Sequence, residues 1–427
     1  MAVHLLTPEL RTNFRHLYAD IFWFGVLAGS TLSFVAVFAT RLGATGFQIS
    51  LLTAGPGVVN LLFSLPAGRW LEGRPLIRAS FWSAVLSRFG YLVLIPLPLL
   101  LGESPQIWAI VIITLIMSVP GTLLAIGFNA LFADVVPPDW RGEVVGRRNA
   151  IVAVSMTVSV LLSGQLLDMI IFPYNYQIVF GLGALGALLS TYHVGRLRGL
   201  SGEPPERVGR PIRDQASSGW LRLGGLRLSI GLRFLTRSQG KPLLRPDLLN
   251  SSFGLLLATF LAFYAFQYTT IPLFPLFQVR VLDLTDSAIS LGSSLFYAVM
   301  FLASLRLSSL SARYGHRRVM VFGALIFIFY PLLLGLATDA TLFWIASIFG
   351  GAAWAIVSAG MINRLMEVVP DDERPAYMAL HNLVLNLGIL SGSLLGPALG
   401  EWIGLREAIL LGAGLRLLAG VLLWIWG

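Results

Sequence analysis

Long apolar segments separated by short polar stretches run through the whole chain. Each has about 20 residues, enough for a helix to cross roughly 30 Å of hydrocarbon. The sequence predicts twelve spans, at about residues 20–40, 48–68, 79–101, 106–132, 149–167, 176–195, 250–277, 288–305, 319–337, 341–363, 375–399 and 405–426. Lipid offers no partner to a free backbone N–H, and these runs lack the period-two alternation of a transmembrane barrel. We therefore expect an all-α integral membrane protein.

The composition agrees with this class. Hydrophobic residues make up 56% of the 427 residues and charged residues only 12%, whereas a soluble chain of this length needs far more charge. There is no cysteine, which excludes disulfides and thiolate metal sites. The first residues lack a short apolar region followed by a small-residue cleavage site, so we expect no cleaved signal peptide.

Basic residues indicate how the spans are oriented. With the N-terminus inside, 25 of the 30 Lys and Arg residues fall in inner loops and 3 in outer loops, namely Arg41, Arg280 and Arg406. Inner loops of membrane proteins carry this excess. We therefore expect both termini in the cytoplasm and the chain in the cytoplasmic membrane. The net charge of +9 is then an orientation signal and does not indicate nucleic-acid binding.

A polar phrase occurs twice, 233 residues apart. Residues 135–141 read Val-Val-Pro-Pro-Asp-Trp-Arg, and residues 368–374 read Val-Val-Pro-Asp-Asp-Glu-Arg. Each copy follows one apolar segment and precedes another. The chain is thus predicted to consist of two related six-helix halves, which in polytopic proteins commonly meet at a transport pathway. We place these halves at residues 1–195 and 248–427.

Residues 196–247 are predicted to form a long central loop in the cytoplasm. Its first part is rich in Arg, Gly, Pro and Ser and is typical of a flexible linker. Its second part, residues 220–237, places Leu, Ile and Phe beside repeated Arg, a composition suited to membrane lipid of the anionic inner leaflet. The alternation there has period two, so a regular amphipathic helix is not favoured.

Three loops carry short motifs of one known family. The loop after the second span reads Gly-Arg-Trp-Leu-Glu-Gly-Arg at residues 68–74, the loop at 308–318 keeps an R-x-G-x-R spacing, and the loop at 138–146 has an acid-x-R-G pattern. With twelve spans in two halves and a long central loop, the chain resembles the major facilitator superfamily. Glu72 replaces the family's Asp, Ala312 replaces an acid, and the fifth span lacks the G-P-x-x-G core of antiporters.

The resemblance implies a secondary transporter of a small organic solute, and it places spans one, four, seven and ten around a central cavity. Carried over by position, these spans offer polar and aromatic candidates for solute binding, namely Trp23, Asn129, Tyr264, Gln267, Tyr268 and Trp354. In the seventh span the spacing of three and four residues puts the three candidates on one helical face. For any single amide, interhelical hydrogen bonding is an equally common role.

Charged residues of the inner loops are candidates for gating by ion pairs that form in one state and break in the other. These residues are Glu72, Asp139, Arg141, Arg313, Glu367, Asp372 and Arg374. Helix capping and positive-inside charge are the alternative roles.

Within the spans, charge is costly and usually functional. Arg88 and Arg416 lie deep in the third and twelfth spans. Arg88 is a candidate for binding an anion, with bonding to backbone carbonyls as the alternative, and for Arg416 we favour the structural role. No Asp or Glu lies at mid-depth. Asp20 and His381 are the candidates for proton coupling, and uniport remains an alternative.

Other chemistry is not indicated. The sequence has no Walker A lysine motif, no G-x-S-x-G, no H-E-x-x-H and no Cys/His metal set, so we expect no direct drive by ATP, no cofactor and no metal. An integral membrane enzyme would need a convergent acid, base or metal, and a non-transporting receptor would favour a sizeable extramembrane domain. We expect a monomeric transporter, and the aromatic, apolar character favours export of an amphipathic solute.

Overall fold

The computed structural model describes residues 7–71, 74–199, 246–370 and 374–427. Most of the central loop, including the segment at 220–237, lies outside these ranges, as do Glu72 and Asp372. The described residues form helices and contain no strand, which confirms the all-α membrane fold.

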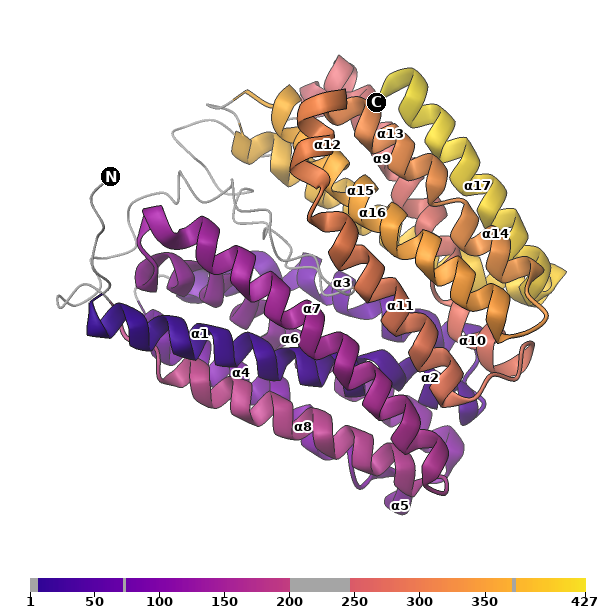
Figure 1. Ribbon diagram of the computed structural model, residues 1–427, viewed down its shortest axis with the longest axis horizontal. Coiled ribbons are helices and arrows are strands. Elements are labelled where there is room, and N and C mark those ends of the chain that lie inside the picture. The colour runs from indigo at the N-terminus through magenta and orange to yellow at the C-terminus, as the bar shows by residue number, and fades with distance from the viewer. Residues whose placement is uncertain (1–6, 72–73, 200–245, 371–373) are drawn as a thin grey trace.

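Six spans make up the first half (Figure 1). They are α1 (Pro8–Leu27) with the π-helix η1 (Ala28–Leu32) and α2 (Ser33–Arg41), then α3 (Gly46–Leu71), α4 (Leu76–Leu94) with the short α5 (Leu97–Leu100), α6 (Glu103–Val135), α7 (Pro138–Met169) and α8 (Tyr174–Gly195).

The second half repeats this order. A 3-10 turn, η3 (Pro246–Asn250), leads into α9 (Ser252–Thr270) with α10 (Leu273–Arg280), α11 (Asp286–Ser304), the short α12 (Leu307–Tyr314), α13 (His316–Ile326) with α14 (Phe329–Leu336), α15 (Ala340–Val368), α16 (Arg374–Ile403) and α17 (Leu405–Trp426). In the described ranges, eleven helices are long and apolar enough to cross a membrane. The twelfth span is α4, which carries Arg78 and Arg88.

The first span of each half is interrupted. In the first half the interruption is the π-helix, where the Ser30 and Ser33 hydroxyls donate to the carbonyls of Val26 and Ala28 at 2.6 and 2.8 Å. In the second half it falls at Pro272, which has no N–H to continue the helix. The outer segments α2 and α10 can therefore run in directions of their own.

The two halves meet at one end and diverge at the other (Figure 1). We call the end where α2 and α10 finish the far end, and the end where α1 begins and α17 finishes the terminal end. A core cluster at the far end draws on both halves, with Phe38 and Tyr176 from the first and Phe277 and Phe343 from the second. At the terminal end, the cluster around Leu17 and Val144 comes from the first half alone.

Two helix pairs close the far end, α7 with α11 and α3 with α16. Both rely on close approach of small residues. A Cβ on Gly164 of α7 would lie 2.0 Å from the Ser290 hydroxyl, and a Cβ on Gly46 of α3 would lie 2.5 Å from the Pro397 ring. Such distances leave no room for a larger side chain, so these glycines let the halves touch.

Candidate functional site

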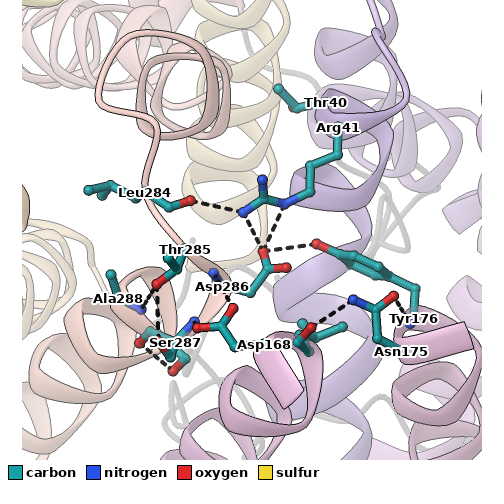
Figure 2. A network of polar contacts seen from close by, with 12 residues as sticks. Thr40, Arg41, Asp168, Asn175, Tyr176, Leu284, Thr285, Asp286, Ser287 and Ala288 are labelled. Carbon is teal, nitrogen blue, oxygen red and sulfur yellow. Dashed lines mark hydrogen bonds and ion pairs between the residues drawn. The ribbon is translucent and has the colours of Figure 1, made fainter. Parts of the chain in front are cut away.

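An ion pair between Arg41 and Asp286 joins the halves at the far end (Figure 2). Arg41 is the last residue of α2, and Asp286 is the first of α11. The arginine donates from Nε and Nη2 to Asp286 Oδ1 at 3.0 and 2.9 Å, and from Nη2 to the Leu284 carbonyl at 2.9 Å. The carboxylate side chain is only 6% exposed. Partial burial weakens screening by solvent, so this pair is stronger than an ordinary surface pair.

Tyr176 of α8 adds a second donor from the first half. Its hydroxyl lies 2.9 Å from the same Asp286 oxygen. The tyrosine is fully buried and its ring packs 4.5 Å from that of Phe38. Asn175 fixes the start of α8 by donating to the Leu167 carbonyl at 2.7 Å. The tyrosine hydroxyl is thus presented to Asp286 by a rigid support.

Asp168, at the end of α7, caps α11 across the boundary between the halves. Its two carboxylate oxygens accept from the backbone N–H groups of Asp286 and Ser287 at 3.0 and 3.1 Å. Within its own half, α11 is capped by Thr285, which accepts from Ala288 N at 3.2 Å. A carboxylate at a helix N-terminus is favoured by the free N–H groups and the helix dipole. The first turn of α11 is therefore held from both halves.

The arginine that ends the first span of each half donates a hydrogen bond to a loop of the other half. Arg41 donates to the carbonyl of Leu284, in the loop that follows α10. Arg280, the last residue of α10, donates at 2.5 Å to the carbonyl of Ala44, in the loop that follows α2. A hollow of about 660 Å³ lies beside this network and is lined also by Asp283 and Thr40. The far end is thus closed by charged contacts that water reaches on one side.

The three seventh-span candidates for solute binding lie in the packed interior of the second half. Tyr264, Gln267 and Tyr268 are 2%, 3% and 8% exposed. The Tyr264 hydroxyl lies 3.1 Å from Nε2 of His381 on α16. The Gln267 side-chain oxygen is buried and has no hydrogen-bond partner among the described residues. Gln267 therefore has unused hydrogen-bonding capacity, and its solute-binding role stays a prediction.

The other solute candidates are distributed between both halves. Trp23 is half-buried on α1, and Asn129 is exposed on α6. Trp354 is half-buried on α15, and its ring lies 5.7 Å from that of Phe327. Arg88 is buried and donates to the Thr191 hydroxyl at 2.9 Å and more weakly to the Ala187 carbonyl. Both partners of Arg88 lie on α8, so its described contacts stay within the first half.

Arg416 links helices of the second half. It donates to the Thr270 hydroxyl at 2.7 Å, to the Gln267 carbonyl at 3.2 Å and to the Phe327 carbonyl at 3.3 Å. Thr270 and Phe327 lie at the interruptions between α9 and α10 and between α13 and α14. A broken membrane helix needs such donors from neighbouring helices. This geometry is that of the structural role expected for Arg416.

Asp20, a coupling candidate, forms a buried ion pair. Its carboxylate accepts from Arg148 of α7 at 3.1 Å and from the Ser190 hydroxyl of α8 at 2.5 Å. Arg148 also donates to the Leu17 carbonyl at 2.6 Å. Two charges removed from water in this way are stable only as a pair. Protonation of Asp20 would remove its charge and leave Arg148 uncompensated.

The described gating candidates contact residues of their own half. Arg141 donates to the carbonyls of Val136 and Ala133 at 3.1 and 2.8 Å, which caps the end of α6. Glu367 pairs with Arg364 on the same helix at 3.0 Å.

Asp139 is exposed in the first turn of α7, and exposed Arg313 lies over the Tyr314 ring. Only the backbone of Arg374 is described. For this set a gating role stays a prediction.

Sequence reasoning missed the residues that join the halves. Arg41 and Arg280 were counted only as outer-loop charges, and Asp168, Tyr176 and Asp286 were not singled out for any role. One signal was available, because both arginines directly end the first span of a half. Their partners lie more than 230 residues away in sequence, and no local pattern indicates such contacts.

Comparison with known proteins supports the resemblance. The profile of the Major Facilitator Superfamily matches residues 21–285 and 255–427. Multidrug resistance protein 2 of Bacillus subtilis (strain 168) is 25% identical over 154 residues, which cover 35% of this chain and 37% of that protein. The matched stretch is thus little more than a third of that relative.

Two solved structures share the fold over almost the whole chain. One is an inward-facing bacterial homologue of the iron transporter ferroportin, with a TM-score of 0.69, 16% identity and coverage of 98% of this chain and 99% of that chain. The other is the nucleoside transporter NupG, with a TM-score of 0.66, 15% identity and coverage of 97% and 98%. Because the family profile matches most of its length, the chain belongs to the Major Facilitator Superfamily, and it is a multi-pass membrane transporter rather than an enzyme.

Proposed function

We propose that this protein moves a small organic solute across the cytoplasmic membrane by alternating access, and that the described conformation faces inward. The observation that carries the proposal is the network of Arg41, Asp286 and Asp168, which closes the far end while the halves diverge at the terminal end. The 25-to-3 division of basic residues favours a cytoplasmic terminal end. Opening outward then requires the loss of these charged contacts and gains compensating contacts between the halves at the terminal end.

The proposed solute site centres on the α9 face of Tyr264, Gln267 and Tyr268, with Trp354, Trp23 and Asn129 contributing from other spans. Gln267 supports this choice because its buried side-chain oxygen has no hydrogen-bond partner in the described part of the chain. A buried unpaired acceptor is costly, and a solute donor supplied during the transport cycle would satisfy it. The aromatic rings fit an amphipathic or aromatic solute better than a strongly hydrophilic one.

Export is the direction we favour. The aromatic, apolar character of the candidate site suits a solute that partitions into membranes, and the partial relative from Bacillus subtilis carries the name Multidrug resistance protein 2. Proton coupling through Asp20 or His381 is proposed as the driving force, because both are titratable side chains that are buried in the protein. Uniport is the alternative, and transport measurements in proteoliposomes distinguish uniport from proton coupling.

The direct test is transport in proteoliposomes that contain a pH-sensitive dye. Neutral, anionic and cationic solutes are each supplied on one side, with an imposed proton gradient of either sign. We expect at least one amphipathic solute to cross faster than in protein-free liposomes, with a change of internal pH that reverses when the gradient is reversed. Solute flux without a pH change would establish uniport. Equal flux with and without protein for every solute class would reject the proposed function.

A further inference from the structure

A corner of the second half, formed by α12, the start of α13 and the end of α15, has an uncapped helix N-terminus. Gly315, with φ of +81°, ends α12 and turns the chain directly into α13. No side chain caps α13, and its first turn contains no acidic residue. The N–H groups of His316, Arg317 and Arg318 therefore have no partner within their helix, and the positive end of the helix dipole faces outward.

Three buried polar atoms in this corner lack hydrogen-bond partners in the part of the chain that the structure describes. They are Ser311 Oγ, His316 Nδ1 and Arg364 Nε, and Ser311 is only 8% exposed. Ser311 belongs to the last turn of α12, because its carbonyl accepts from Gly315 N at 3.0 Å. Each of the three atoms can donate a hydrogen bond.

Packing between α13 and α15 brings Arg364 to the level of His316. A Cβ on Gly360 of α15 would lie 2.6 Å from the Met320 Cα of α13, so these two residues are in register. The helices run in opposite directions. Arg364, one turn after Gly360 on α15, therefore lies beside His316, one turn before Met320 on α13. Arg364 thus lies level with His316 at the free N-terminus of α13, and Ser311 lies one turn before that N-terminus along the chain.

Among the residues that the structure describes, the corner is basic. Arg313 and Arg318 are exposed and form no ion pair with described residues. Arg317 is engaged with the carbonyls of Trp424 and Ile425 at 2.8 and 3.1 Å. The described carboxylate here is Glu367, which pairs with Arg364 through Nη1 and leaves Nε unused. Free N–H groups, and donors and arginines without a partner among the described residues, are together the features of an anion site.

We propose that this corner binds a phosphoryl group, and that its occupant is the headgroup of an anionic phospholipid of the cytoplasmic leaflet. Exposed apolar side chains at the end of α11 and on α13 favour a lipid, since Leu302, Leu305 and Phe322 are 60%, 61% and 59% exposed. They would contact acyl chains while the headgroup lies at α13. The described residues of the site belong to the second half, and the site is separate from the proposed solute-binding residues.

Native mass spectrometry of the purified protein in detergent tests the site. The probes are phosphatidylglycerol, phosphatidylcholine with the same acyl chains, and inorganic phosphate. The variants are Arg313→Gln with Arg318→Gln, and separately Ser311→Ala, which removes a donor without changing charge. The matched control is Arg11→Gln with Arg15→Gln, which removes two exposed arginines of α1 at the same end of the molecule.

We expect the wild type and the control to retain phosphatidylglycerol in preference to phosphatidylcholine. Retention should fall roughly fivefold for each arginine removed from the corner, and Ser311→Ala should also lower it while the protein stays monodisperse. Equal retention of both lipids by the wild type, or an equal loss in the control, would overturn the proposal. If the protein retains inorganic phosphate but not phosphatidylglycerol, the occupant is not a lipid, and free phosphate is identified as the ligand.

Discussion

A single carboxylate oxygen of Asp286 accepts hydrogen bonds from both Arg41 and Tyr176, so one side chain of the second half joins two helices of the first. On the opposite side of the far end, α3 and α16 meet by close packing and by one bond from the Ser50 hydroxyl to the Ser393 carbonyl. The closure is therefore asymmetric, with charge on one side and packing on the other. Charged contacts regain water when they separate, which makes the charged side suited to reversible opening.

Removal of the Arg41 charge should favour opening of the far end. Arg41→Gln loses a charge-assisted hydrogen bond worth about 1.5–3 kcal/mol, which corresponds to a shift of roughly 10- to 150-fold in a two-state equilibrium. A single cysteine at Ser294, which is buried where α11 bonds the Thr157 carbonyl, reports the opening. An impermeant maleimide added at the far end should label it faster in the variant.

The control for this experiment is Arg147→Gln, because Arg147 pairs with Glu143 on the exposed surface of α7. Labelling of the Ser294 cysteine should stay at the wild-type rate in that variant. If Arg41→Gln also labels at the wild-type rate, the ion pair does not hold the far end closed.

Loss of the cap on α11 should change both stability and conformation. Asp168→Ala removes an acceptor shared by two N–H groups and should cost about 0.5–2 kcal/mol, whereas Asp168→Asn should retain most of the cap. Asp339 caps α15 within one half, with a bond of 2.8 Å from Thr341 N, and so Asp339→Ala is the matched control. Both alanine variants should lower Tm, but only Asp168→Ala should speed labelling of the Ser294 cysteine.

Gln267 should affect solute affinity more than stability if it contributes to the proposed site. Gln267→Ala would then weaken binding by about 1–2 kcal/mol with little change in Tm. Gln106→Ala is the control, because Gln106 of the first half is likewise 3% exposed and its buried amide nitrogen has no partner among the described residues. Solute affinity and Tm are measured on both variants. A lower Tm with unchanged affinity for Gln267→Ala would assign that residue to interhelical bonding.

The buried pair of Asp20 and Arg148 should be stabilising only when intact. Asp20→Asn leaves Arg148 without a counter-charge and should destabilise the protein by about 3–5 kcal/mol, while adding Arg148→Met should recover most of that loss. If Asp20 couples transport to protons, the double variant should still exchange solute across proteoliposomes but no longer change internal pH. Full proton coupling in the double variant would exclude Asp20 from that role.

The orientation of the chain can be checked with two glycines that have open space around them. A Cβ on Gly102, before α6 at the far end, or on Gly142, near the start of α7 at the terminal end, would meet no atom within 4 Å. Because the natural chain has no cysteine, each single cysteine reports alone. In intact cells an impermeant maleimide should label Gly102→Cys, and should label Gly142→Cys only after permeabilisation. The opposite pattern would invert the topology.

The sequence by itself determined the class and the repeat. Apolar length fixes the number of helices, since lipid leaves no other way to satisfy the backbone, and the duplicated phrase at 135–141 and 368–374 placed six spans in each half. The third span was predicted at 79–101 from its apolar run, although Arg88 makes it less apolar than the others. Each apolar span and each copy of the phrase is a continuous stretch of chain, so these features need no knowledge of tertiary contacts.

Only the tertiary structure determined which charged residues form contacts with one another. Arg41 and Asp286 are 245 residues apart, and their pairing depends on how the far ends of the two packed halves meet. The hydrophobic periodicity of the sequence carries no information about that contact. The spacing of Tyr264, Gln267 and Tyr268 predicts one helical face, but whether that face points to a cavity or into the helix α16 beside it depends on the neighbouring helices. Burial and pairing are properties of the assembled halves, because they depend on which surfaces exclude water from one another.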